Sequence, residues 1–176
     1  MGLVIESFDN IKKSDAEENE DGEYVDPILG TILDDVVFLW VNPDFSERAE
    51  EIETGPYTVG KSFSFSAGSY SSYNNWRNEL AKLAGWPEGE YKQYGRGWKS
   101  YAASVWNAKE GPFWELIYFS DCEGVIGFNV AAKLAKDFET FEDKAKNHPN
   151  ERFRTIYENM HMAFALAANS GVVQFH

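Results

Sequence analysis

Residues 62–85 read S-F-S-F-S-A-G-S-Y-S-S-Y-N-N-W-R-N-E-L-A-K-L-A-G, and their apolar spacing changes halfway along. Up to Ser66 the apolar side chains alternate with hydroxyls, which predicts a half-buried strand over 57–66 with a serine-lined outer face. From Tyr73 onward the spacing becomes three or four residues, which predicts a helix that ends at Gly85. A strand is therefore expected to end here, followed by a Gly-Ser turn and then by a helix.

Further elements are predicted on both sides of this stretch. The continuous apolar runs 36–41 and 113–119 are typical of strands covered on both faces. Trp86 to Gly97 has the glycine and proline content of a loop, and 101–108 is compatible with a helix or a strand. The other expected elements are a strand at Val4-Ile5, a helix over 130–145, a helix from Pro149 to Gly171, and a final strand over 172–176.

Because strands come early and helices late, we expect an α+β fold. The chain has 176 residues, which fits one domain over 1–176. We expect a mixed or antiparallel sheet of about four to six strands, packed against about three helices. The composition of 43% apolar and 16% aromatic residues excludes global disorder.

The sequence also predicts where the protein works. No apolar run approaches the roughly 20 residues of a membrane span. Met1 to Asn10 lacks the patterns of a signal peptide and of N-myristoylation. Cys122 is the single cysteine, which excludes an internal disulfide and a Cys-rich zinc site. We therefore expect a cytoplasmic protein with no membrane partner and no cofactor.

The net charge of −13 lies in the first third of the chain, where residues 1–60 hold 16 acidic and three basic residues. We expect an acidic, mobile insert at about 12–27. Alternatively, residues 12–26 imitate the phosphate rows of nucleic acid and dock on a basic protein partner. A calcium loop is disfavoured, because Asp15 to Asp26 lacks the ligand spacing of an EF-hand. This acidic surface argues against direct nucleic-acid binding.

The turn at 66–77 is the first candidate site. Free N–H groups at a helix start attract anions, and serine hydroxyls add donors. Aromatic rings would stack on a planar ligand, while an arginine would supply a fixed cation. The alternative is N-capping by Ser71 or Ser72, with two of the aromatic residues in the core. The candidate ligand-binding residues here are Ser69, Tyr70, Ser71, Tyr73, Asn74, Trp76 and Arg77.

The second candidate site is F-S-D-C-E-G-V-I-G, at 119–127. Asp121 and Glu123 are placed as paired carboxylates, for acid–base chemistry or a divalent metal. Alternatively, Asp121 caps the turn and Glu123 pairs with a lysine. Glu115 interrupts the apolar run, and we expect it to reach an edge or to lie in a pocket with a partner such as Arg77.

The cysteine and the three histidines give no further candidate site. Cys122 lies between two acids that disfavour its thiolate, so we reject it as a nucleophile. His148 and His161 are expected at the surface. His176 would complete a metal site with Asp121 and Glu123, but the chain has no metal-binding or serine-hydrolase motif, and we assign no metal.

Three strings resemble a family of small uncharacterised proteins from bacteria and their phages. They are G-S-Y-S-S-Y-N-N-W-R-N-E-L-A-K-L-A-G at 68–85, F-S-D-C-E-G-V-I-G at 119–127 and the closing G-V-V-Q-F-H. The similarity covers residues 63–176 and leaves out the acidic first 60 residues. The resemblance implies a bacterial or phage accessory protein, in the host cytoplasm if phage-encoded. It implies no activity, because none is assigned to the family.

Three functions are compatible with these observations. The favoured one is a non-catalytic protein that binds a small polar or anionic ligand in an aromatic, serine-rich pocket, floored by a strand over 113–123. In a phage setting, which only the resemblance implies, the ligand would be a nucleotide-type defence signal. The alternatives are an acidic decoy that blocks a protein partner, and a carboxylate- or metal-dependent hydrolase using Asp121 and Glu123. The sequence favours a non-enzyme and leaves the oligomeric state open.

Overall fold

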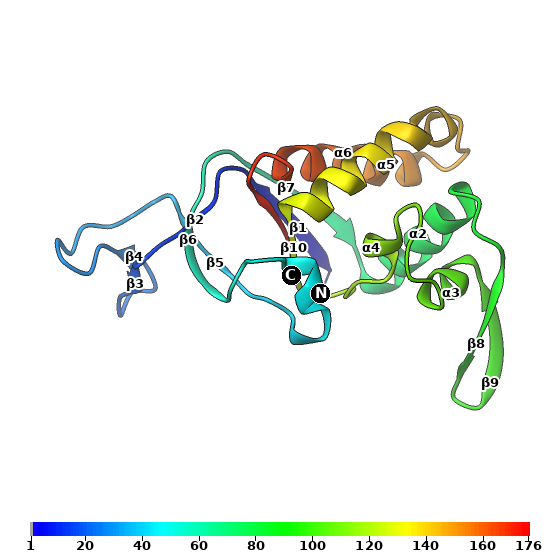
Figure 1. The fold of residues 1–176 in the computed structure, drawn as a ribbon, viewed down its shortest axis with the longest axis horizontal. Helices are drawn as coiled ribbons and strands as arrows, with labels where there is room; N and C mark the ends of the chain where they lie inside the picture. Colours follow the sequence, from blue (N-terminus) through cyan, green and yellow to red (C-terminus); the bar gives the residue numbers. More distant parts are fainter. Residues whose placement is uncertain (1) are drawn as a thin grey trace.

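A four-stranded antiparallel sheet with the order β10-β11-β1-β7 lies at the centre of the computed structural model, which describes residues 2–176 (Figure 1). The first and last strands of the chain pair side by side, with Ile5 opposite Phe175. The α+β class predicted from the sequence is confirmed. The strands of this sheet are β1 (Leu3–Phe8), β7 (Ser62–Gly68), β10 (Gly124–Gly127) and β11 (Val172–Phe175).

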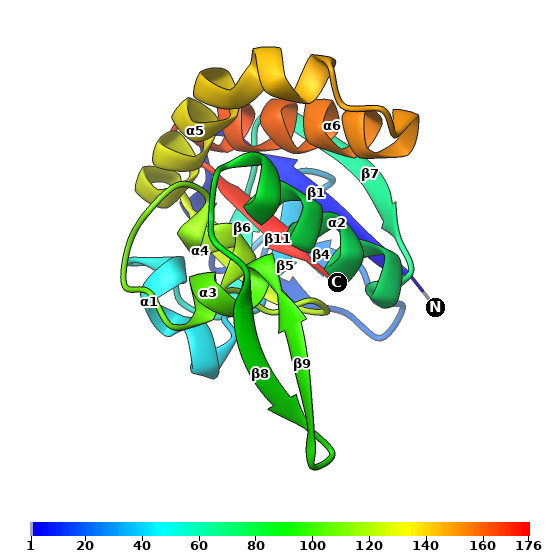
Figure 2. The same ribbon diagram turned by 90° about the vertical axis from the view of Figure 1, so that its right-hand side faces the viewer.

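Helices cover one face of this sheet (Figure 2). Side chains of a strand alternate between its two faces, so Leu3, Ile5 and Ser7 point toward the helices. Ser7 donates from Oγ to the carbonyl oxygen of Ala163 at 2.6 Å. The core between the layers is apolar and includes the fully buried Phe138. The helices are α2 (Tyr70–Leu83), α3 (Tyr101–Trp106), α4 (Trp114–Ile117), α5 (Phe128–Lys146) and α6 (Glu151–Ala167).

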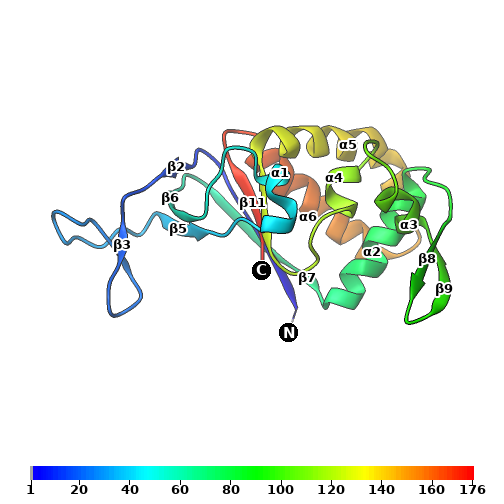
Figure 3. The ribbon, with the colours of Figure 1, turned by 60° about the horizontal axis from the view of Figure 1, so that its bottom comes forward.

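A smaller three-stranded sheet, in the order β2-β6-β5, lies against part of the other face. A second apolar cluster forms there, with Phe8, Leu39 and Val125 among its buried members. Beyond this sheet the acidic segment projects away from the body (Figure 3). The elements on this side are β2 (Lys12–Lys13), β3 (Glu17–Glu18), β4 (Tyr24–Val25), β5 (Val36–Leu39), the 3₁₀ helix η1 (Pro43–Phe45), α1 (Ser46–Ala49) and β6 (Gly55–Thr58).

The predicted strands at 57–66 and 36–41 differ from the structure. The first is divided between β6 and β7, which belong to different sheets, because the chain turns at Gly60, whose N–H donates to the carbonyl oxygen of Asp9 at 2.9 Å. The serine side chains of β7 are exposed, as expected. The second strand ends at Leu39 and is an edge strand with Phe38 46% exposed, so it is not covered on both faces.

The predicted strand at 113–119 is wrong. Phe113 has a left-handed φ of 55°, and the single-turn helix α4 follows it. The N–H of Phe113 donates to the carboxylate of Asp137 at 2.8 Å, which fixes the start of the turn. An apolar run of this length fits a buried helix as well as a strand, so tertiary partners decide its conformation. The expected floor of the binding pocket is therefore a helix and a turn.

The segment from Trp86 to Gly97 is not a loop. It forms most of a hairpin of β8 (Gly89–Gln93) and β9 (Arg96–Ser100), with Tyr91 opposite Trp98. Tyr94 and Gly95 at its turn have φ values of 51° and 75°, which suits a tight hairpin turn. The ambiguous segment at 101–108 contains helix α3. The long helices α2, α5 and α6 confirm the predictions made from apolar spacing, and β11 confirms the expected final strand. Among residues 2–176, no helix has the length and apolar character that crossing a membrane requires.

Candidate functional site

The first turn of helix α2 is capped by a serine of the same segment. Ser69 is the N-cap residue, and its Oγ accepts from the N–H of Ser72 at 3.3 Å. The hydroxyl of Ser71 lies 3.2 Å from the same oxygen. Tyr73 and Trp76 are buried, with their ring centroids 5.8 Å apart. They belong to the core and offer no stacking surface to a ligand, and the cap is Ser69 rather than Ser71 or Ser72.

Arg77 is buried one turn further along α2, with 7% of its surface exposed. Its Nη1 donates to the carbonyl oxygens of Ile117 at 3.2 Å and Phe119 at 2.6 Å. Its Nη2 donates to Oδ1 of Asn74 and lies 3.9 Å from Oδ2 of Asp121. Asn74 Nδ2 donates to the same carboxylate oxygen at 2.6 Å. The guanidinium therefore holds the turn after α4 against α2, and its charge is compensated by Asp121 and by the carbonyl dipoles.

A second buried arginine, Arg48 on α1, holds the same turn from the other side. Its Nε and Nη2 donate to the carbonyl oxygens of Glu115 and Tyr118, each at 3.2 Å. Its guanidinium carbon lies 4.1 Å from the ring centroid of Trp114. Burial lowers the pKa of Arg48, and the carboxylate of Glu47, 3.1 Å away, opposes that change. Two arginines thus fix a short segment that has no sheet partner.

The side chain of Glu115 points toward α5 and does not pair with Arg77. Its Oε2 lies 2.5 Å from Nζ of Lys133, which also lies 2.8 Å from Oδ2 of Asp137. The same Asp137 oxygen accepts the N–H of Phe113. This network attaches α4 to α5. Glu115 is therefore a structural carboxylate, and the partner expected for it from the sequence is wrong.

The turn that carries the paired acids is closed by Ser120. Its Oγ accepts from the N–H groups of Cys122 at 3.3 Å and Glu123 at 3.2 Å. Asn42 Nδ2 donates to the carbonyl oxygen of Glu123 at 3.1 Å. Asp121 does not cap the turn, contrary to the alternative considered above, and no lysine lies within ion-pair distance of Glu123 in the described residues. Both carboxylates line the same open space.

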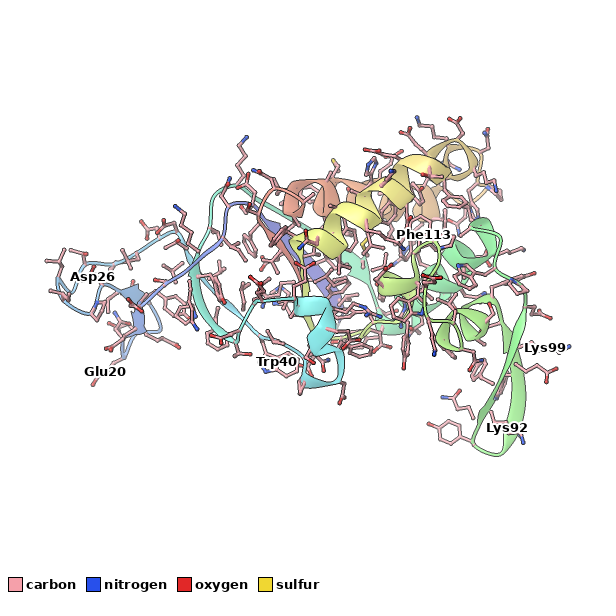
Figure 4. The ribbon with its side chains drawn as sticks, viewed as in Figure 1. Glu20, Asp26, Trp40, Lys92, Lys99 and Phe113 are labelled. Carbon is pink, nitrogen blue, oxygen red and sulfur yellow. The ribbon has the colours of Figure 1, made fainter. Side chains whose placement is uncertain are left out.

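That space is a cleft of about 890 Å³, bounded by α2, the turn after α4, the segment around η1, and the hairpin β8–β9. Its size suits a small-molecule ligand. Figure 4 shows Trp40 on the lower side of the molecule, the side on which the hairpin bearing Lys92 projects. The main lining side chains are the aromatic Trp40, Phe45, Tyr91, Trp106 and Tyr118, the polar Ser71, Asn74, Asn75, Asn78 and Gln93, and the charged Asp44, Arg77, Asp121 and Glu123.

Half of the residues predicted from the sequence line this cleft. Four polar cleft residues of α2 are spaced by three, one and three residues, which places them on one face of the helix: Ser71, Asn74, Asn75 and Asn78. This spacing was a sequence signal from which Asn75 and Asn78 could have been predicted. Tyr91 of the hairpin was missed because the segment was interpreted as a loop. The predicted residues in the cleft are Ser71, Asn74, Arg77, Asp121 and Glu123, and those outside it are Ser69, Tyr70, Tyr73, Trp76 and Glu115.

Two of the histidine side chains pair with acids other than Asp121 and Glu123. His176 Nε2 is 3.2 Å from a carboxylate oxygen of Glu6, and His148 Nε2 is 3.6 Å from one of Glu79. In the part of the chain that the structure describes, no three histidine, cysteine, aspartate or glutamate side chains gather closely enough to hold a metal ion. The metal site considered for His176 is therefore not formed.

Comparisons with protein-family models, with curated proteins and with solved structures find no match for this chain. The resemblance of residues 63–176 to small bacterial and phage proteins therefore stays a prediction.

Proposed function

We propose that this protein is a binding protein whose cleft takes a small, polar, ring-bearing ligand that is uncharged or cationic. The observation that supports this proposal best is the combination of exposed aromatic rings, free amide groups and an excess of carboxylates in one cleft. Neutral nucleosides, sugars and aromatic amines are the classes of ligand with matching chemistry.

The aromatic side chains supply flat apolar surface. Tyr118 is 41% exposed and Trp106 is 39% exposed, although large hydrophobic side chains are usually buried. Trp106 is held in place by an edge contact with Tyr91, with ring centroids 5.3 Å apart. A ring-bearing ligand would cover these surfaces by stacking.

The amides supply directional hydrogen bonds. Asn78 Oδ1 accepts the N–H groups of Tyr101 at 2.8 Å and Ala102 at 3.3 Å, so its NH₂ group is left as a donor. Across residues 2–176, the side-chain amides of Asn75 and Gln93 have no hydrogen-bond partner within the protein. These groups are the candidates for hydrogen bonds to hydroxyls and ring nitrogens of the ligand.

The charges argue against a phosphate. Arg77 is the one basic residue among the described lining residues, and its guanidinium is already bound to carbonyl oxygens and to Asp121. Asp44 and Glu123 add negative charge. Because like charges repel across a cleft of this size, these carboxylates would weaken the binding of a phosphorylated ligand. A nucleotide-type defence signal is thus a weaker candidate than a nucleoside or a sugar.

A thermal-shift screen tests the proposal, using neutral nucleosides, sugars and aromatic amines, each beside a phosphorylated or carboxylated counterpart. A ligand at about 100 times its Kd stabilises the fold by about 2.7 kcal/mol, which raises the Tm by roughly 5–10 °C for a chain of this length. We expect the neutral or cationic members to give the larger shifts.

Cleft variants show whether a hit binds where proposed. Asn75→Leu and Tyr118→Ala remove one amide and one ring without removing a side-chain hydrogen bond of the fold. Asn159→Leu on α6, outside the cleft, is the matched control. Hits should be lost in the cleft variants and kept in the control. Hits that survive both cleft variants, or that come only from phosphorylated compounds, would contradict the proposal.

A further inference from the structure

Two hairpin-like projections extend from opposite ends of the molecule (Figures 1 and 4). The first, here called the acidic arm, comprises residues 14–35, which hold nine acidic residues and no basic one. The second, here called the basic tip, comprises residues 91–99 of the hairpin β8–β9, which hold three basic residues and no acidic one. The two projections therefore carry opposite charge.

The acidic arm also exposes aliphatic side chains. Ile28 is 90% exposed, Leu29 is 74% exposed and Ile32 is 54% exposed. Their turn is ordered by Asp26, whose Oδ1 accepts the N–H groups of Ile28 and Leu29, each at 2.8 Å. The N–H of Gly30 donates to the carbonyl oxygen of Asp26 at 2.8 Å. The arm therefore presents its aliphatic groups at a defined turn, within a segment whose charged residues are all acidic.

The basic tip exposes aromatic side chains. Tyr94 is 95% exposed at the turn, and Trp98 is 50% exposed. Within the described residues, the side chains of Lys92 and Arg96 form no ion pair, while Lys99 lies 3.7 Å from Glu90. Exposed aliphatic and aromatic groups with opposite charges around them are chemically complementary.

We propose that the acidic arm of one copy of this protein docks on the basic tip of a second copy. The two surfaces lie at opposite ends of one chain and do not meet within it (Figure 3). The docked Ile28 and Leu29 would pack on Tyr94 and Trp98, with carboxylates of the arm beside Lys92 and Arg96. Because arm and tip are different surfaces, each pairing leaves one arm and one tip free, so the contact is head-to-tail and generates chains or closed rings.

A second copy explains more of the structure than a nucleic acid does. Cations interleaved with aromatic rings are also typical of surfaces that bind single-stranded nucleic acid. A strand bound at the tip would leave the aliphatic groups of the arm uncovered, whereas a second copy covers both surfaces at once. In this proposal, the basic partner expected for residues 12–26 is the basic tip of a second copy. The proposal does not depend on which ligand the cleft binds.

Sedimentation velocity of the full chain tests this proposal. An interface of two small projections is at the low end of the known size range, so we expect a Kd on the order of 100 µM at moderate salt. The sedimentation coefficient should rise with protein concentration. Raising the ionic strength from about 0.1 M to about 1 M shortens the screening length from about 10 Å to about 3 Å and should weaken the association at least about tenfold.

Two variants give a decisive result. The double variant Lys92→Glu/Arg96→Glu changes the tip, and Ile28→Ser/Leu29→Ser changes the arm. Each should be monomeric alone, since each lacks one half of the contact. Mixed in equal amounts, they should form a dimer that does not grow, because one intact arm meets one intact tip. The control Lys109→Glu/Lys136→Glu makes the same charge change at exposed lysines outside both surfaces and should associate like the wild type.

Several outcomes would overturn the proposal. They are a wild-type chain that stays monomeric up to about 1 mM, variants that associate like the wild type, or a mixture of folded variants that forms no dimer. Thermal unfolding of each variant confirms that it is folded. Tight binding of a single-stranded oligonucleotide that competes with self-association and is lost in Lys92→Glu/Arg96→Glu would assign the tip to nucleic acid instead.

Discussion

Arg77 provides the sharpest test of how the cleft is built. The variant Arg77→Met removes the guanidinium and keeps an apolar stem of similar length. It leaves the buried carbonyl oxygens of Ile117 and Phe119 without their charged donor, and it leaves Asp121 without its cation. Loss of two hydrogen bonds to a buried charge costs about 3–5 kcal/mol. For a chain of this length, that lowers the Tm by roughly 6–20 °C.

The assay is urea and thermal unfolding of Arg77→Met, with Arg96→Met as the matched control. Arg96 is exposed on the hairpin, and its replacement should change the stability by less than about 0.5 kcal/mol. A loss below about 1 kcal/mol for Arg77→Met, or a loss equal to that of the control, would refute the structural role of Arg77. If the role holds, an Arg77 variant is unsuitable as a test of ligand contact.

Three further predictions concern stability and are checked by unfolding measurements. Tyr73→Phe should be neutral or stabilising by up to about 1 kcal/mol, because the buried Tyr73 hydroxyl has no partner among the described residues; a clear loss would reveal a partner. Gly171→Ala should cost about 2–3 kcal/mol, because an added Cβ would lie 1.9 Å from the carbonyl oxygen of Phe8; a neutral result would contradict this packing. The N–H of Lys61, 2.6 Å from the Asp9 carboxylate, lowers the pKa of that group. The stabilising effect of this hydrogen bond is fully present above the unfolded-state pKa of Asp9, about 3.9, and is lost as the pH falls through the lower pKa of Asp9 in the folded state. The stability of Asp9→Asn should therefore depend less on pH between about 5 and 2 than that of the wild type, and equal slopes would exclude this contribution.

The sequence predicts the long helices and the two terminal strands of this fold and misses several of the short elements between them. Helices α2, α5 and α6 repeat their apolar spacing over several turns, so periodicity alone identifies them. Helix α4 is a single turn whose conformation depends on Arg48, Arg77 and Asp137, which are distant in sequence. No local pattern contains that information. The hairpin was missed because its glycines resemble those of a loop, although the Tyr94-Gly95 turn favours pairing.

The same distinction holds for the candidate site. Ser71, Asn74 and Arg77 on α2 and the acids at 121 and 123 were found, because each lies in a local motif, whereas Asn75 and Asn78 of the same helix were missed. The rings that complete the cleft come from β8, from α3 and from the segment after β5. Their approach to α2 depends on how these elements pack, which the order of residues along the chain does not reveal.

The measurement that tests the central claim most directly is a paired calorimetric titration. The neutral or cationic compound with the largest thermal shift is titrated beside its phosphorylated counterpart, into the wild type and into Asn75→Leu. We predict that the uncharged or cationic form binds at least about tenfold tighter, a difference of about 1.4 kcal/mol, and that Asn75→Leu weakens its binding. Equal or tighter binding of the phosphorylated form, with no effect of Asn75→Leu, would contradict the function proposed for the cleft.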